Sequence, residues 1–207
     1  MLRELVQDKK LRARVLERVE EFLLNNKAGE EIWFRELILC LLTANSSFIS
    51  AYKALNNLYS HDIELLDMEQ ISVILRDSGY RFYNLKSRYI REAIEKYYGR
   101  IKTLVKPIAD IDQFEAREFL VNNIKGLGYK EASHFLRNLG YFELAIIDRH
   151  ILRYVNTNLY VSVKKVDNKH RYLLVEGLLR AIASALNMQA GLLDLFIFFK
   201  QTQTLVK

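Results

Sequence analysis

One lysine and one aspartate, Lys130 and Asp148, are the residues of this sequence whose types and spacing could do chemistry together. Lys130 follows a glycine-rich turn at residues 125–129 (KGLGY) and lies in the first turn of the helix predicted after it. The positive end of a helix dipole favours the neutral amine of a lysine there, and a neutral amine is a nucleophile. Asp148, eighteen residues later, could orient that amine and stabilise a developing positive charge. Taken singly, Lys130 could equally be an exposed helix lysine, and Asp148 a helix N-cap.

The turn at residues 125–129 is typical of a hairpin between two helices that binds a phosphate. Glycine lets the chain turn tightly and approach a ligand closely, so backbone N–H groups can point at an anion. The helix after the turn has apolar residues at helical spacing and is expected to end at Gly140. These apolar residues are Ala132, Phe135, Leu136 and Leu139. Many DNA-binding modules without catalytic activity carry such a hairpin, so the hairpin alone indicates backbone binding.

The hairpin, Lys130 and Asp148, in this order and spacing, resemble the helix-hairpin-helix motif and following aspartate of the endonuclease III-like DNA glycosylases, a superfamily of base-excision repair enzymes. The step from Asp148 to His150 matches as well. Over its whole length the sequence resembles the archaeal-type 8-oxoguanine DNA glycosylase/AP lyases, which lack the extra N-terminal domain of the eukaryotic enzyme. The resemblance implies that Lys130 is the nucleophile and that Asp148 is the catalytic aspartate of the superfamily.

The implied reaction begins with extrusion of the damaged nucleotide, because its glycosidic carbon is out of reach inside the duplex. Lys130 would attack C1′ as a free amine and, after loss of the base, hold the sugar as a Schiff base. β-Elimination of the 3′ phosphate then becomes accessible, which is the AP lyase activity. Asp148 would orient the amine and stabilise positive charge that develops at the sugar.

The resemblance also implies a set of contacts to DNA. The backbone would be bound by Lys125, Gly126, Gly128, Arg149 and His150. Asn45 lies at the helix–helix junction where related enzymes fill the hole left by the extruded base, although asparagine also favours helix caps. Tyr80 would wedge into the base stack and Arg81 would donate to the unpaired cytosine. The alternative is a packed tyrosine and a surface arginine. Ser50 replaces an arginine of the eukaryotic enzyme, which indicates weaker selectivity for the opposite cytosine.

Recognition of the oxidised base is implied for the end of the chain and for one residue of the hairpin helix. The candidate pocket residues are Asp194, Phe198, Phe199, Lys207 and His134. An aromatic ring could stack on the purine, and the terminal carboxylate could accept from the N7–H group that distinguishes 8-oxoguanine from guanine. The alternative is that the aromatic residues belong to the core, and His134 could face the pocket or the core.

The composition predicts an all-α protein. Of the 207 residues, 50% are hydrophobic and 27% are charged, with one proline and eight glycines. Residues 7–25 are expected to form an amphipathic helix, and residues 33–42 a buried one that contains Trp33 and Cys40. The apolar face of the first helix would carry Val15, Leu16, Val19, Phe22 and Leu23.

The resemblance implies a helix-hairpin-helix DNA glycosylase fold with two helical lobes. Residues 30–140 would form a central helical barrel that ends in the hairpin. Residues 1–29 and 141–207 would form the second lobe. The cleft for DNA, and the active site with it, would lie between the lobes.

The charge distribution points to an anionic partner. The formal net charge is +6 and the pI is about 9.3. Residues 76–106 hold nine Lys or Arg and three Asp or Glu, a net charge of 9 − 3 = +6. Such a stretch is either a solvated helix face or a phosphate-binding surface. With the resemblance, the expected partner is double-stranded DNA with a damaged base, bound by a monomer.

Neither a membrane span nor a bound metal is predicted. No apolar run approaches the roughly 20 residues of a transmembrane helix, and the charged start lacks the apolar core of a signal peptide. The protein is therefore expected in the cytoplasm, at the nucleoid of an archaeal or prokaryotic cell. The single cysteine, Cys40, is incompatible with the four-cysteine iron–sulfur cluster of some relatives. No cofactor is expected, although a monovalent ion at the hairpin carbonyls would be a family feature.

The predicted function is thus that of a bifunctional 8-oxoguanine DNA glycosylase/AP lyase, and two alternatives remain. The same machinery could act on another lesion, such as an oxidised pyrimidine or a mispaired base. A non-catalytic helix-hairpin-helix DNA-binding module would keep the hairpin but would have no use for Lys130 and Asp148.

Overall fold

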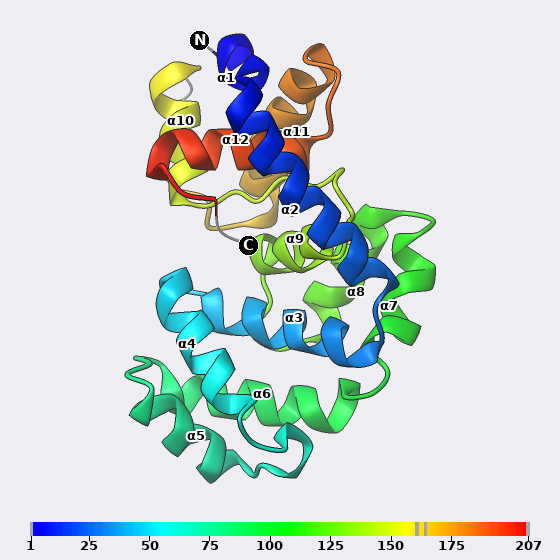
Figure 1. Ribbon diagram of the computed structural model, residues 1–207, viewed down its shortest axis with the longest axis vertical. Helices are drawn as coiled ribbons and strands as arrows, with labels where there is room; N and C mark the ends of the chain where they lie inside the picture. Colours follow the sequence, from blue (N-terminus) through cyan, green and yellow to red (C-terminus); the bar gives the residue numbers. More distant parts are fainter. Residues whose placement is uncertain (1, 160–161, 164, 206–207) are drawn as a thin grey trace. The chain divides into compact units, whose positions relative to one another are not determined.

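The regular structure of the described residues, 2–159, 162–163 and 165–205, is entirely helical in this computed structural model (Figure 1). The helices are α1 (Leu2–Gln7), α2 (Lys9–Lys27), α3 (Glu30–Thr43), α4 (Phe48–Leu58), the 3-10 helix η1 (Ile63–Leu65), α5 (Met68–Asp77), α6 (Tyr83–Tyr97), α7 (Ile101–Ala109), α8 (Gln113–Asn123), α9 (Tyr129–Asn138), α10 (Arg149–Asn158), α11 (Lys169–Ala185) and α12 (Ala190–Thr202). The predicted all-α class is confirmed. No single helix in these ranges is long and apolar enough to cross a membrane; α11 and α12 meet that criterion only as a pair, bent by 96°.

The chain divides into two compact units. We call Lys27–Phe135 the middle unit, and Met1–Asn26 with Leu136–Lys207 the terminal unit. The predicted lobes, 30–140 and 1–29 with 141–207, have similar bounds. Their separate roles in binding DNA remain a prediction.

The middle unit is built around α3, which packs against α4, α6 and α7. The segment is apolar nearly all round, and a helix of that composition is stable only when it is buried on every side. Trp33 and Cys40 are both 0% exposed, as predicted. The Trp33 ring meets Phe135 edge-on, with ring centroids 6.1 Å apart, so the core reaches the helix that follows the hairpin.

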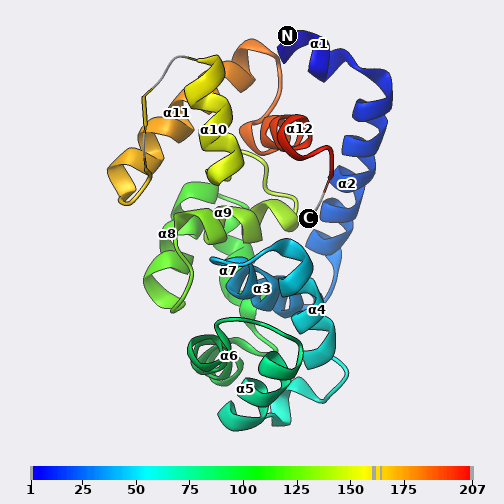
Figure 2. The same cartoon turned by 90° about the vertical axis from the view of Figure 1, so that its left-hand side faces the viewer.

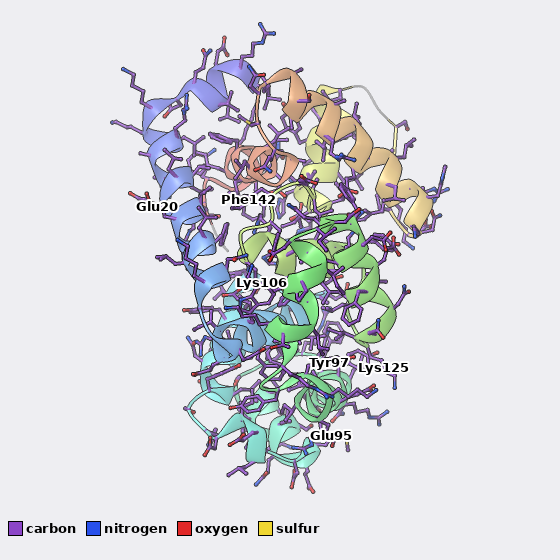
Figure 3. All side chains as sticks on the ribbon, turned by 90° about the vertical axis from the view of Figure 1, so that its right-hand side faces the viewer. Glu20, Glu95, Tyr97, Lys106, Lys125 and Phe142 are labelled. Carbon is purple, nitrogen blue, oxygen red and sulfur yellow. The ribbon has the colours of Figure 1, made fainter. Side chains whose placement is uncertain are left out.

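In the terminal unit, α12 packs against α10, α11 and α1 (Figure 2). The end of α2 meets the end of α9, because the Asn26 side-chain amide donates to the Leu139 carbonyl at 2.7 Å. Gly140 ends α9 with φ of +81°, as the sequence predicts. Phe142 follows, and its ring, labelled in Figure 3, lies 6.3 Å from that of Phe22 on α2.

The prediction for the first helix was wrong in two respects. The helix is interrupted at Asp8, whose carboxylate accepts the Leu11 N–H at 2.8 Å and starts a new helix. Its predicted apolar face is too wide, since Leu16 and Leu23 are 57% and 44% exposed. Only one narrow stripe of α2 is buried. That stripe consists of Leu11, Val15 and Phe22.

Candidate functional site

The glycine hairpin between α8 and α9 is held closely against α6 in the middle unit. Gly126 has φ of +91°, a left-handed conformation that residues with a side chain rarely adopt. A Cβ at this position would lie 2.5 Å from Cδ2 of Tyr89 on α6. The Gly128 N–H donates to Oε2 of Glu131 at 3.2 Å. A phosphate bound at the Gly128 N–H would therefore have to replace the Glu131 carboxylate.

We expect Gly126→Ala to lower the free energy of unfolding by about 3 kcal/mol, because alanine adds left-handed strain and a clash with Tyr89. Urea unfolding followed by circular dichroism would measure this loss. Gly177→Ala is the control: nothing lies within 4 Å of a Cβ at this position in α11. That variant should gain about 0.5 to 1 kcal/mol. A Gly126→Ala protein as stable as the wild type would contradict the close packing of the hairpin.

Lys130 lies in the first turn of α9, as the sequence predicts. Its side chain is 30% exposed, and Nζ lies 3.2 Å from Oε1 of Glu131. The same carboxylate thus binds the hairpin through one oxygen and the lysine through the other. An amine attacks carbon only when it is neutral, so Lys130 must lose both its proton and this partner before it can act as a nucleophile.

A second lysine, Lys86 on α6, belongs to the same cluster, and the sequence interpretation missed it. Lys86 is only 4% exposed, and its Nζ lies 5.7 Å from the centre of the Tyr89 ring. Burial lowers the pKa of the Lys86 ammonium to about 8, with Glu131 acting to raise the pKa and Lys130 acting to lower it. The sequence did contain a sign that Lys86 is buried, because it lies four residues before Ile90, on the face of α6 that is buried.

Lys125, a predicted contact to the DNA backbone, is the exposed lysine of the hairpin. Its side chain is 69% exposed, and Nζ lies 3.0 Å from Oε2 of Glu92 on α6. Tyr97, also on α6, donates its hydroxyl to the Asn123 carbonyl at 2.7 Å at the other end of the turn. Figure 3 labels Lys125 and Tyr97. The hairpin is therefore fixed from α6 on both sides, and the charge of Lys125 stays at the surface.

In the terminal unit, Asp148 is the N-cap of α10. Its Oδ1 accepts the N–H groups of His150 and Ile151, both at 2.8 Å. Among the described residues no donor is recorded for Oδ2. The cap interpretation is therefore correct, and it leaves one carboxylate oxygen for the catalytic interpretation as well.

Three buried side chains hold the segment that leads into Asp148. The N–H groups of residues 145–147 donate, in order, to Glu176 at 3.1 Å, to Asp194 at 2.9 Å and to the Tyr172 hydroxyl at 3.3 Å. The Tyr172 hydroxyl donates in turn to the first carbonyl of the segment at 2.7 Å. Such contacts between α11, α12 and a loop depend on the tertiary fold, so local sequence patterns gave no sign of them. They leave little freedom to the backbone before Asp148.

Asp194 was predicted for the base pocket, and the structure corrects this prediction. The residue is 2% exposed, its Oδ1 pairs with Arg137 Nη1 at 2.9 Å, and its Oδ2 accepts the Ile146 N–H. Both oxygens are thus engaged inside the terminal unit, and the buried carboxylate is not exposed for contact with a base. Burial raises the pKa of Asp194 to about 6, although the Arg137 guanidinium acts in the opposite direction.

The other pocket candidates differ in position. Phe198 lies half-buried against His150, with ring centroids 5.3 Å apart in an edge-on arrangement. Phe199, also half-buried, lies 5.2 Å from the guanidinium carbon of Arg14. His134 is 7% exposed, in agreement with its core alternative. Lys207 lies outside the described residues.

His150 and Arg149, the predicted backbone contacts of α10, lie next to each other. The Nε of Arg149 donates to Nε2 of His150 at 3.2 Å. The Nδ1 atom of His150 is buried and has no hydrogen-bond partner in the described ranges. Arg149 itself is exposed, so its guanidinium can reach a phosphate.

Of the three residues predicted for the gap left by the base, two are at the surface. Asn45 is exposed with φ of 62°, and the capping role at α4 belongs to Ser47, which accepts the Ser50 N–H at 3.1 Å. Arg81 is exposed and lies over the Phe82 ring at 4.4 Å. The wedge prediction for Tyr80 is not supported. Tyr80 is 1% exposed, and its hydroxyl donates to a backbone carbonyl, so the packed alternative holds.

No group of three or more His, Cys, Asp or Glu side chains that could hold a metal ion occurs in the described part of the chain. The expectation that the protein works without a cofactor remains a prediction.

Comparisons with known proteins agree on one family. A sequence model described as 8-oxoguanine DNA glycosylase matches residues 15–188. The 8-oxoguanine DNA glycosylase/AP lyase of Sulfolobus acidocaldarius is 63% identical over 207 residues, and that of Sulfurisphaera tokodaii is 62% identical. Both alignments cover all of each chain.

Solved structures give the same result. The chain is similar to the Methanocaldococcus jannaschii 8-oxoguanine glycosylase/lyase, crystallised with a 15mer DNA containing 8-oxoguanine, with a TM-score of 0.91 and 36% identity. This comparison covers 100% of the present chain and 98% of the other. The 8-oxoguanine DNA glycosylase of Thermotoga maritima gives a TM-score of 0.86 at 36% identity, with the same coverage.

Proposed function

This chain belongs to the 8-oxoguanine DNA glycosylase family, and we propose that it removes 8-oxoguanine from duplex DNA and cleaves the abasic strand with the amine of Lys130. The observation that carries the proposal is the position of Lys130. It lies in the first turn of α9, directly after a hairpin whose left-handed residue, Gly126, leaves no free space for a side chain. The helix dipole and the hairpin N–H groups make this place suitable for a reaction beside a phosphate.

The reaction follows from the chemistry of an amine. The neutral Lys130 nitrogen attacks C1′ of the extruded nucleotide, and the bond from C1′ to N9 breaks, with its electron pair leaving on the base. The sugar ring opens to a protonated Schiff base, which makes the C2′ proton acidic. Loss of that proton and cleavage of the C3′–O bond release the 3′ phosphate. Hydrolysis of the Schiff base then returns the free amine.

Asp148 is the residue we propose to stabilise positive charge at the sugar. Its Oδ1 is fixed as the cap of α10, so the carboxylate has a defined orientation and its second oxygen remains available. A preorganised carboxylate stabilises a cationic transition state without reorganising during the reaction. The hydrogen bonds that Glu176, Asp194 and Tyr172 accept from the backbone of residues 145–147 support this role, because they fix the chain just before Asp148.

Double-stranded DNA is the partner that the charge distribution favours. The excess of positive charge falls in residues 76–106, which include exposed Arg81 and Arg88 in the middle unit. Exposed Lys125 and Arg149 add charge beside the hairpin and at the start of α10. We propose that one copy of the chain binds one lesion, and that the protein works where the chromosome is, in the cytoplasm at the nucleoid.

The test uses the wild-type protein and duplexes with one defined lesion. We expect release of free 8-oxoguanine opposite cytosine, cleavage 3′ to the abasic site, and a covalent adduct when borohydride is added. Duplexes with an oxidised pyrimidine or a G·T mismatch are the matched controls. An adduct formed only with those duplexes would support the alternative lesion. Binding to damaged duplexes without any adduct would support the non-catalytic module.

A further inference from the structure

Two lysines and one carboxylate form a single charged cluster at the hairpin, and the reaction described above uses only one of the lysines. Lys130 is paired with Glu131 at 3.2 Å, and Glu131 also accepts the Gly128 N–H. The side chain of Lys86 is buried beside them on α6. In the described part of the chain, no hydrogen bond or ion pair is recorded for Lys86.

Lys86 is 4% exposed, so its ammonium has lost much of its hydration, and no hydrogen bond recorded among the described residues replaces it; this is costly. Methionine or leucine would fill the same place on the apolar face of α6 at no such cost. The Lys86 ammonium lies 5.7 Å from the centre of the Tyr89 ring, and this is the same ring that a Cβ on Gly126 would meet at 2.5 Å. Lys86 therefore lowers the stability of the folded protein, and it does so beside the hairpin and Lys130. A destabilising polar residue at such a place is typical of a functional role.

The charges around Lys86 suggest what that role is. Among the described residues, the charges that act on the Lys86 ammonium are Glu131, which attracts it, and the Lys130 ammonium, which repels it. By symmetry, a positive charge on Lys86 attracts Glu131 and repels the Lys130 ammonium. Both effects weaken the ion pair between Glu131 and Lys130. That pair must break, and Lys130 must lose its proton, before attack on C1′.

We propose that Lys86 is a positioning residue for the nucleophile: its buried positive charge opposes the hold of Glu131 on Lys130 and so releases the Lys130 amine for attack. The proposal rests on the function given above, and it deepens that function by assigning a second lysine to the site. Lys86 itself forms no bond to DNA in this scheme.

The pH dependence distinguishes this role from simple packing. The pKa of Lys86 is lowered to about 8, so its charge is present below that pH and is lost above it. Lys86→Met keeps most of the length and volume of the side chain but never carries the charge. At low pH, Lys86→Met should therefore form the Schiff base with DNA more slowly than the wild type. As the pH rises beyond 8, the two rates should approach each other. A packing defect would lower the rate by the same factor at every pH.

The measurement is the rate of borohydride trapping on a duplex with one preformed abasic site, under single-turnover conditions. The abasic site makes the result independent of which base the enzyme excises. At about pH 6.5 we expect Lys86→Met to form the adduct about tenfold more slowly than the wild type, and at about pH 9 within about twofold. Lys86→Arg, which stays charged throughout, should remain close to the wild-type rate at the lower pH.

A double-mutant cycle with Glu131→Gln tests the route of the effect. Glutamine still accepts the Gly128 N–H but no longer carries the charge that holds Lys130. In that background Lys86→Met should change the trapping rate by less than about threefold at low pH. An equal loss with and without Glu131, or a loss independent of pH, would overturn the proposal. A wild-type protein that forms no adduct on the abasic duplex would instead contradict the proposed lyase function.

Discussion

Lys130→Gln should abolish the borohydride adduct and slow the release of 8-oxoguanine by at least about 10³-fold. Glutamine keeps much of the side-chain length and a polar end, but its amide nitrogen cannot attack C1′ or form a Schiff base. Because the Lys130 side chain is 30% exposed and its ion pair is with the adjacent residue Glu131, the variant should fold like the wild type. Single-turnover excision on a duplex with 8-oxoguanine opposite cytosine, with and without borohydride, would measure both effects.

Lys125→Gln is the matched control for this experiment. It removes the same charge from the same hairpin, but at a side chain that is 69% exposed and paired with Glu92. We expect a normal adduct, with DNA binding that is weaker and less dependent on salt, because one phosphate contact is lost. Asp148→Asn is a useful third variant, since asparagine can still cap α10 while the negative charge is gone. Base release by Lys130→Gln at the wild-type rate would show that another group is the nucleophile.

The parts of the site that could be predicted from the sequence are those determined by nearby residues. A glycine hairpin followed by a helix fixes the place of Lys130, and the residues after Asp148 make it an N-cap whatever the fold around it. The stop at Gly140 and the buried helix α3 are equally local, because they depend on one glycine and on one apolar run. The catalytic assignment, however, came from the resemblance, since each residue alone also fits a structural role.

The burial of individual polar side chains could not be predicted, because it depends on which face of a helix packs against the rest of its unit. Tyr80 and Asp194 are polar residues next to apolar segments, and either could be exposed until packing is known. The fold buries both: Tyr80 bonds to a carbonyl of α3, and Asp194 bonds to Arg137 and to a loop N–H. Lys86 was overlooked for the opposite reason. A lysine in a basic segment was interpreted as a surface charge, whereas its spacing with buried residues places it inside.

Arg137→Met should lower the free energy of unfolding by about 3 to 5 kcal/mol, because the substitution leaves a buried carboxylate without its partner. The side chains of Arg137 and Asp194 are only 6% and 3% exposed, so water cannot replace the lost contact. In a protein of this size the loss corresponds to a decrease in Tm of roughly 10 °C. Thermal unfolding followed by circular dichroism would measure it, with the wild type under the same conditions.

The pH dependence of this loss has a definite sign. Burial raises the pKa of Asp194 to about 6, above the ordinary value of 3.8. A carboxyl group whose pKa is raised in the folded state stabilises that state at low pH, and the stabilisation is lost as the pH rises through the raised value. Without Arg137 the pKa should be higher still. The Arg137→Met protein should therefore lose the most stability above pH 6 and recover part of it below, where the neutral acid needs no counter-charge.

A second substitution separates the charge from the hydrogen bond. Asp194→Asn, added to Arg137→Met, removes both charges and keeps an oxygen that can accept the Ile146 N–H. Replacing a buried ion pair by neutral groups is often tolerated, so the double variant should recover most of the lost stability and its dependence on pH should disappear. If the double variant were as unstable as Arg137→Met, packing of the Arg137 side chain against the Phe22 ring, 5.4 Å away, would be the larger effect. Ile146 lies two residues before Asp148, so a disturbed Asp194 should also slow base excision by Arg137→Met. The double variant should recover excision together with stability, measured at temperatures below its thermal unfolding transition.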